Sequence, residues 1–178
     1  MNKLILPALA LLATLPAQAV QTQAGVQAAV VFPQNDLRSN VDGTMGLTFG
    51  VNVDIDLQGG SEARPRLDYT QCDTEPFHVL SLSTTSRTVH GASLGVDYLR
   101  FIEGGRRGLY GILGTGLQWM SASDPVYGNT HQTAPFLRLG AGFRFDSSFG
   151  AEITYNLGSF RSTAGTGGSI QAGITYNF

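Results

Sequence analysis

The stretch Met45-Gly46-Leu47-Thr48-Phe49-Gly50-Val51-Asn52-Val53-Asp54-Ile55-Asp56-Leu57 alternates strictly between apolar residues and residues that are polar or glycine. Successive side chains of a β-strand point to opposite faces, so this period of two predicts a long strand with one apolar and one polar face. The same alternation recurs over residues 137–146, 151–158 and 170–178, and in weaker form over 26–32, 66–70, 92–102 and 109–119. The sequence therefore predicts eight strands, with no helical segment and no second domain.

The links between these strands alternate in length. Three are short and resemble turns, and four are longer and polar. The short links cover residues 58–64, 103–107 and 146–149, and the long links cover about 33–44, 72–88, 121–132 and 161–167. An up-and-down barrel that carries its short turns at one end produces this alternation. The predicted fold is all-β: an eight-stranded antiparallel up-and-down barrel.

Composition excludes several classes of protein. The 178 residues carry a formal net charge of −2, which argues against a nucleic-acid partner because such proteins need a strongly basic surface. A single cysteine excludes an intramolecular disulfide framework and a multi-cysteine metal cluster. Only 13% of the residues are charged, which is low for a soluble domain, where about a quarter is usual.

The first 19 residues have the features of a secretory signal peptide. Lys3 supplies the positive start, residues 4–15 form an apolar core, and Ala17-Gln18-Ala19 is a cleavage site of the small-x-small type. No cysteine follows this site, which argues against a lipoprotein anchor. We therefore expect a signal peptide over residues 1–19 and a barrel domain over residues 20–178.

Alternation alone does not decide whether the apolar face points into the barrel or outward. Three features favour a barrel that crosses a membrane: the polar face is rich in glycine, several strands reach the ~9–11 residues that span a bilayer, and aromatic residues gather at the strand ends. The aromatic residues near the short turns are Tyr98, Phe143, Phe145, Phe149, Tyr176 and Phe178, and those at the opposite ends are Phe32 and Trp119. A soluble periplasmic barrel that binds a ligand inside is the alternative.

The chain ends with Gln171-Ala172-Gly173-Ile174-Thr175-Tyr176-Asn177-Phe178. This segment resembles the C-terminal assembly signal of bacterial outer-membrane proteins, with Gln171, Gly173, Tyr176 and Phe178 at its four defining positions. The mature chain is similar to small eight-stranded outer-membrane barrels of the OmpA, OmpX and OmpW kind. The resemblance implies localisation in the outer membrane, recognition by the barrel-assembly machinery and contact with outer-membrane lipid and lipopolysaccharide. It also implies that the short turns face the periplasm and the long links face outside.

The polar faces of the predicted strands supply a candidate network for the barrel lumen. We expect its charged members to be Asp54, Asp56, Arg66, Asp68, Asp97, Arg138, Arg144 and Glu152, accompanied by Asn52, Gln118 and Asn156. Arginine and carboxylate side chains can pair there and fill an interior that eight strands leave just wide enough for side chains. A narrow conduction path through the same residues is the alternative. Arg100 falls on the face predicted to meet lipid, near the short turns.

Candidate catalytic groups are few and poorly arranged. His78, His90 and His131 lie in or beside the predicted long links. His90 and Ser93 have the spacing His-x-x-Ser, which places them on opposite faces of a strand, whereas lipid A deacylases of the outer membrane carry His-x-Ser. A metal site built from Cys72, Asp73, His78 and His90 matches no strong spacing motif. We expect no catalytic, metal-binding or cofactor-binding residues, and therefore not an enzyme.

The hypothesis for function is a non-enzymatic barrel with a structural role or a role in surface interaction through its long links. The longest link, residues 72–88, opens with Cys72, a lone thiol that could be exposed, and carries several apolar residues for a surface partner. A narrow channel for small or hydrophobic molecules is the main alternative, and a lipid-modifying enzyme is a weaker one.

Overall fold

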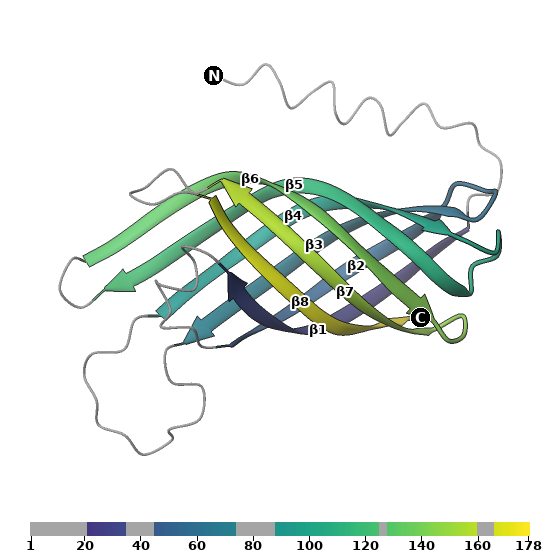
Figure 1. Cartoon of the computed structure of the whole chain (residues 1–178), viewed down its shortest axis with the longest axis horizontal. Helices are drawn as coiled ribbons and strands as arrows, with labels where there is room; N and C mark the ends of the chain where they lie inside the picture. The colour runs from purple at the N-terminus through teal and green to yellow at the C-terminus, as the bar shows by residue number, and fades with distance from the viewer. Residues whose placement is uncertain (1–20, 35–44, 74–87, 125–127, 160–165) are drawn as a thin grey trace, which may run out of the picture.

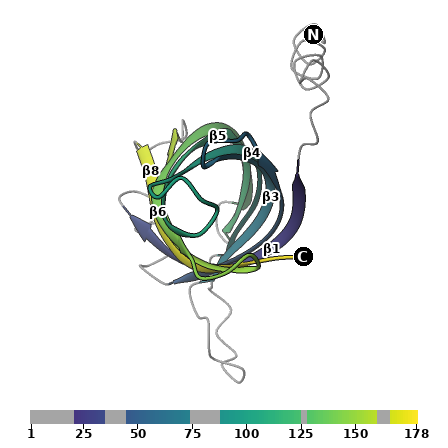
Figure 2. The same ribbon diagram turned by 90° about the vertical axis from the view of Figure 1, so that its right-hand side faces the viewer.

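The computed structural model describes residues 21–34, 45–73, 88–124, 128–159 and 166–178, and in them the chain forms eight antiparallel strands that close into a barrel (Figure 1). The strands are β1 (Thr22–Gln34), β2 (Gly46–Asp56), β3 (Ser61–Asp73), β4 (Thr88–Phe101), β5 (Gly108–Asp124), β6 (Gly128–Arg144), β7 (Phe149–Ser159) and β8 (Thr166–Asn177). Each strand pairs with its neighbours in the sequence, and β1 closes the ring by pairing with β8 (Figure 2). Within these residues no helix is long and apolar enough to cross a membrane.

The strands are staggered around the ring. A row of paired residues that starts at Val30 on β1 and passes through β2 to β5 reaches β6 at His131. The same row followed the other way, through β8 and β7, reaches β6 at Ala141. The two positions differ by ten residues, and this shear makes the strands tilt against the barrel axis. One end of the barrel, the turn end, carries the short turns and the C-terminus, and the other is the loop end (Figure 1).

The apolar face of the sheet points outward and the polar face points into the lumen. Val51, Leu113 and Ile153 expose 54%, 52% and 57% of their surface, whereas Asp54, Arg64 and Asp97 are fully buried. This arrangement is the reverse of a soluble barrel, which keeps its apolar side chains inside. It settles the question that the alternation of the sequence left open.

Several strands are longer than the sequence predicted. β3 begins at Ser61 rather than at residue 66, and β5 and β6 extend through most of the predicted link 121–132. The physical reason is that the apolar alternation marks only the outward positions within the apolar band. Beyond that band the outward residues are polar, as at Gln71, Ser121 and His131, although the backbone ladder continues.

The turn between β6 and β7 is held by one side chain. Asp146 Oδ1 accepts hydrogen bonds from the backbone N–H groups of Phe149 and Ser148, both at 2.7 Å. These two bonds hold the pKa of the Asp146 carboxyl below its usual value of 3.8, because they stabilise its ionised form.

Replacing Asp146 with alanine should lower barrel stability at neutral pH but not in strong acid. A lowered folded-state pKa means that the carboxylate stabilises the fold above pH 3.8, and that this contribution is lost as the pH falls through the lower folded-state value. Urea unfolding of both proteins in detergent micelles should therefore separate them at neutral pH and superimpose them well below pH 3.8. An equal difference at both pH values would show that the turn does not depend on the ionised carboxyl.

Candidate functional site

The lumen near the turn end holds six charged side chains, which we call the turn-end cluster. Its members are Asp54, Glu62, Arg64, Arg106, Arg144 and Glu152. Arg64 joins Asp54, at 2.6 Å from Nε to Oδ1, to Glu152 on the opposite side of the ring. Arg144 bridges Asp54 and Glu62, with both N–O distances at 2.8 Å. Arg106 reaches in from the β4–β5 turn to contact Glu62 and is the only partly exposed arginine of the cluster.

Four more charged side chains form the loop-end cluster, which lies further along the lumen. Arg66 contacts Asp68 at 2.9 Å and Asp97 at 2.8 Å. Arg138 contacts the same two carboxylates, at 3.2 Å and 3.0 Å, and its Nε donates to Asn156 Oδ1 at 2.6 Å. Gln27 donates a further hydrogen bond to Asp68. Each carboxylate is therefore shared between two arginines.

The charges balance within each cluster. Three arginines face three carboxylates in the turn-end cluster, and two face two in the loop-end cluster. Buried charges are tolerated when they are paired and their remaining hydrogen-bonding atoms are satisfied, and removing one partner is costly. A lumen filled in this way is a polar core that holds the barrel together. Each carboxylate of the two clusters has at least one arginine partner.

Inward-facing glycines let these side chains meet across an intervening strand. Tyr110 on β5 and Glu152 on β7 are both paired in register with Gly142 on β6, and Tyr110 OH donates to Glu152 Oε1 at 2.7 Å directly over this glycine. The same arrangement occurs at three other places. Gln27 reaches Asp68 over Gly50, Arg138 reaches Asp97 over Gly114, and Asn52 reaches Asn177 over Gly25. The polar face is thus rich in glycine because these contacts need a strand position without a side chain between the two partners.

Replacing Gly142 with alanine should destabilise the barrel by about 1–3 kcal/mol, the usual cost of adding a methyl group to a filled core. A Cβ at this position would lie 2.3 Å from Tyr110 Cζ, so the tyrosine would have to leave Glu152. Gly111 is the matched control, because it faces outward on the neighbouring strand and a Cβ there meets no atom within 4 Å. Urea unfolding should separate the two variants, and equal stability would contradict the crossing contact.

Apolar side chains close the lumen beside the turn-end cluster. Leu99, Phe101, Tyr110 and Ile112 are buried against one another, and the Phe101 and Tyr110 rings lie 4.9 Å apart. The Arg144 guanidinium stacks over Phe101 at 4.9 Å from the ring centre. This apolar plug was not foreseen, although Leu99 and Phe101 share the strand parity of Asp97. A narrow path for ions would have to pass both the plug and the paired charges.

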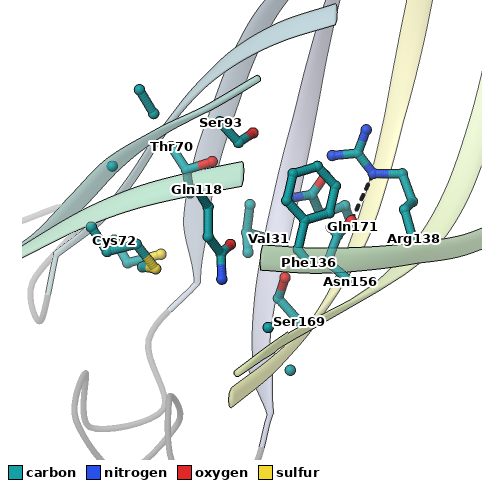
Figure 3. A pocket seen from close by; sticks show the side chains of 15 residues that line it. Val31, Thr70, Cys72, Ser93, Gln118, Phe136, Arg138, Asn156, Ser169 and Gln171 are labelled. Carbon is teal, nitrogen blue, oxygen red and sulfur yellow. Dashed lines mark hydrogen bonds between the residues drawn. The ribbon is translucent and has the colours of Figure 1, made fainter. Parts of the chain in front are cut away.

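A small cavity lies above the loop-end cluster (Figure 3). Its volume is about 50 Å³, enough for a few water molecules. Its lining includes Arg138 and Asn156, together with Gln118, Phe136 and Cys72. Asn156 Nδ2 is buried and has no hydrogen-bond partner among the described residues. The cavity is thus a site for bound water or a few polar atoms.

All but one of the charged residues predicted for the lumen lie in the two clusters. Asp54, Arg66, Asp68, Asp97, Arg138, Arg144 and Glu152 all belong to the two clusters. Asp56 lies at the rim of the turn end, where its Oδ1 accepts from the backbone N–H of Gln58 at 2.7 Å. Arg100 faces outward, and its Nη1 donates to the Gly59 carbonyl oxygen and to Ser61 Oγ.

Sequence reasoning missed Glu62, Arg64, Arg106 and Tyr110. Residues 58–64 were taken as a turn, yet Glu62 and Arg64 continue the inward parity of Arg66 along β3. That parity was the signal that could have found them. Arg106 is a turn residue, and no sequence pattern indicates that its side chain bends back into the lumen.

Cys72 and the histidines also differ from expectation. Cys72 is buried near the end of β3, where it packs with Val31 and Val89, so its thiol is not exposed. His90 points outward on β4, while Ser93 points inward and its Oγ contacts Asp68 at 3.5 Å. His131 is on β6, and His78 lies outside the described residues. Within the described part of the chain, no group of three or more His, Cys, Asp or Glu could hold a metal ion.

Comparison with known proteins places the chain in a family. The family model described as "Outer membrane protein beta-barrel domain" matches residues 5–178. The chain belongs to this family. No curated protein sequence matches the chain. Among solved structures, it is similar to Neisserial surface protein A, with 15% identity, a TM-score of 0.57, and coverage of 90% of this chain and 100% of that one.

Two further solved structures are similar to this outer-membrane barrel. Ail, the attachment invasion locus protein of Yersinia pestis, matches with 14% identity and a TM-score of 0.57, covering 88% of this chain and 97% of that one. The N-terminal barrel domain of Pseudomonas aeruginosa OprF matches with 15% identity and a TM-score of 0.55, covering 89% and 100%. At these identities the likeness shows the fold alone.

The family and the outward apolar face together place the protein in the outer membrane. On β8, Gln171 and Gly173 face the lumen side. Tyr176, and Phe178 just after the end of β8, face outward with their rings 5.3 Å apart. The predicted signal peptide, residues 1–19, lies outside the described residues.

Proposed function

We propose that this outer-membrane barrel is a non-enzymatic structural protein that also contacts a partner at the cell surface through its loop end. The observation that carries the proposal is the lumen, in which charge-balanced clusters and an apolar plug fill the interior. A barrel filled in this way serves better as a rigid support for its loops than as a conduit.

The length of the strands supports the surface role. β5 and β6 have 17 residues each, whereas ~9–11 residues are enough to span the membrane. Their loop-end parts therefore rise above the apolar band as a stiff hairpin. A crystal structure of Ail contains the heparin analogue sucrose octasulfate, so a barrel of this fold can take a ligand. The four loop segments together carry three arginines and three acidic residues, so their net charge favours neither an acidic nor a basic partner.

The test is attachment of cells that display the barrel with residues 74–87 replaced by a short glycine-serine link. We expect attachment to epithelial cells to fall at least tenfold, while the amount of barrel in the outer membrane and its faster gel migration before boiling stay unchanged. A variant with residues 35–44 shortened is the control for loop length. If shortening every loop leaves attachment unchanged, the surface role fails.

The alternative function, a narrow channel, is tested separately. We expect no unitary conductance when the purified barrel is inserted into planar lipid bilayers. Regular conductance steps would favour the channel, and removal of those steps by substitutions in the loop-end cluster would assign them to the lumen.

The C-terminal strand would provide the assembly signal through Gln171, Gly173, Tyr176 and Phe178. Tyr176 and Phe178 are outward-facing aromatic residues at the turn end, so a barrel-assembly factor can reach them from the periplasm. Deleting Phe178 should reduce the amount of folded barrel in the outer membrane, whereas the refolding of purified chain in detergent should change little.

A further inference from the structure

The outer face of the barrel carries a groove at the loop end of β3 to β6. The groove has a volume of about 440 Å³, which lies within the range of ligand-binding sites. The strand register places its residues in two rows. One row is Tyr69, Ala92, Trp119 and Thr133, and the row above it is His90, Ser121 and His131. Two of the three histidines of the chain therefore flank one serine on neighbouring strands.

The groove runs from an apolar end to a polar end. Tyr69 and Trp119 stand on either side of Ala92, whose small side chain leaves a hollow between the two rings. Because the strands tilt, each row climbs toward the loop end as it passes from β3 to β6. His131 thus lies furthest above the apolar band, and Tyr69 lies furthest within it. An amphipathic molecule aligned with the membrane normal would match this order.

The polar end of the groove has few side chains that could bind an anionic group. Arg64, Arg66, Arg138 and Arg144 are inside the lumen, and Arg100, Arg106 and Arg107 are at the turn end. Among the described side chains at the outer face of the loop end, His90 and His131 are therefore the groups able to carry a positive charge. An imidazole donates a hydrogen bond through N–H when neutral and gains a positive charge when protonated. Ser121 and Thr133 add neutral donors.

We propose that this groove binds one molecule of a phosphorylated glycolipid of the outer leaflet, a lipid of the lipid A class. His90, Ser121 and His131 hold a phosphate group, and an acyl chain lies over Ala92 between Tyr69 and Trp119. The location of the protein in the outer membrane supplies the occupant, because the groove opens where the apolar band meets the headgroups of that leaflet. The inference does not depend on the role of the loops.

Trp119 makes the test direct, because it is the single tryptophan of the chain and lines the groove. The whole barrel is placed in phosphatidylcholine nanodiscs, and Trp119 fluorescence is followed as bisphosphorylated lipid A is added. We expect a saturable change in emission, and a much weaker one with lipid A from which both phosphates have been removed. The double variant His90→Ala with His131→Ala should weaken binding about tenfold.

Two matched pairs of variants separate the groove from general lipid contact. Ala92→Phe fills the hollow and should abolish the saturable change, whereas Ala141→Phe places the same ring on the outer face of β6 away from the groove. Gln34→Ala, at the loop end of β1, controls for the loss of a polar side chain. Native mass spectrometry of the same samples counts the lipid A molecules that stay bound.

Some outcomes would overturn the proposal. An equal response to lipid A with and without phosphates would mean that only ordinary boundary lipid covers the groove. Unchanged affinity in the double histidine variant would remove the two imidazoles from the site. Binding that survives in Ala92→Phe but is lost in Ala141→Phe would place the lipid elsewhere on the barrel.

Discussion

Replacing Arg64 with methionine should lower the free energy of unfolding by about 3–5 kcal/mol, the usual cost of removing one partner from a buried ion pair. Arg64 is fully buried and bridges Asp54 and Glu152. Asp54 would keep Arg144, Asn52 and Asn177 as partners. Among the residues that the structure describes, Glu152 would keep only its hydrogen bond from Tyr110. Urea unfolding in detergent micelles or lipid vesicles measures the change.

A double variant tests the cause of this loss. Adding Glu152→Gln to Arg64→Met removes the carboxylate that would otherwise be buried without a cation, so the double variant should be more stable than Arg64→Met alone. Arg107→Met is the control, because Arg107 is exposed at the turn end and its loss should change stability by less than about 0.5 kcal/mol. If Arg64→Met behaves like Arg107→Met, water rather than protein solvates the lumen charges.

Replacing Leu113 with arginine should destabilise the barrel in lipid by about 2–4 kcal/mol, the cost of a cation on the lipid face near the middle of the bilayer. Leu113 is half exposed and lies about midway along the apolar outward stretch of β5, which runs from Leu109 to Trp119. On a soluble protein, a charge at such an exposed position would change stability little. The size of the effect therefore reports that the outward face meets hydrocarbon.

The matched control for this prediction is on the same strand. Leu109 is also outward and exposed, but it lies at the turn end, where an arginine should cost only about 0–1 kcal/mol. Unfolding of both variants from lipid vesicles should show this dependence on depth. Equal effects at the two positions would contradict the proposed placement of the membrane boundary.

The sequence predicted the barrel better than it predicted the ends of its strands. The alternation from Met45 to Leu57 is complete because each outward residue in the apolar band meets the membrane. At His90, Ser121 and His131 the backbone pairing continues, but the outward side chains leave that band and become polar. The polar row of the groove was therefore placed in or beside the predicted links, whereas Tyr69, Ala92 and Trp119 were placed in predicted strands.

In the lumen, too, the sequence predicted which way side chains face but not which side chains meet. Asp97 and Arg138 were predicted to face inward from strand parity, because parity is a property of a single strand. Their contact across Gly114 depends on the register of three strands, which parity does not specify. The bend of Arg106 from a turn back to Glu62 likewise arises only when the barrel closes.

By itself the sequence determined the number of strands, their order and the existence of one apolar and one polar face, because each of these follows from local periodicity and from the lengths of the links. Only the tertiary structure decided how the strands are staggered, and the ten-residue shear set every contact between them. It placed Tyr110 over Gly142 to reach Glu152, and it set Ser121 between His90 and His131. The physical reason is that closing the ring fixes all eight registers together, and no single strand carries that information.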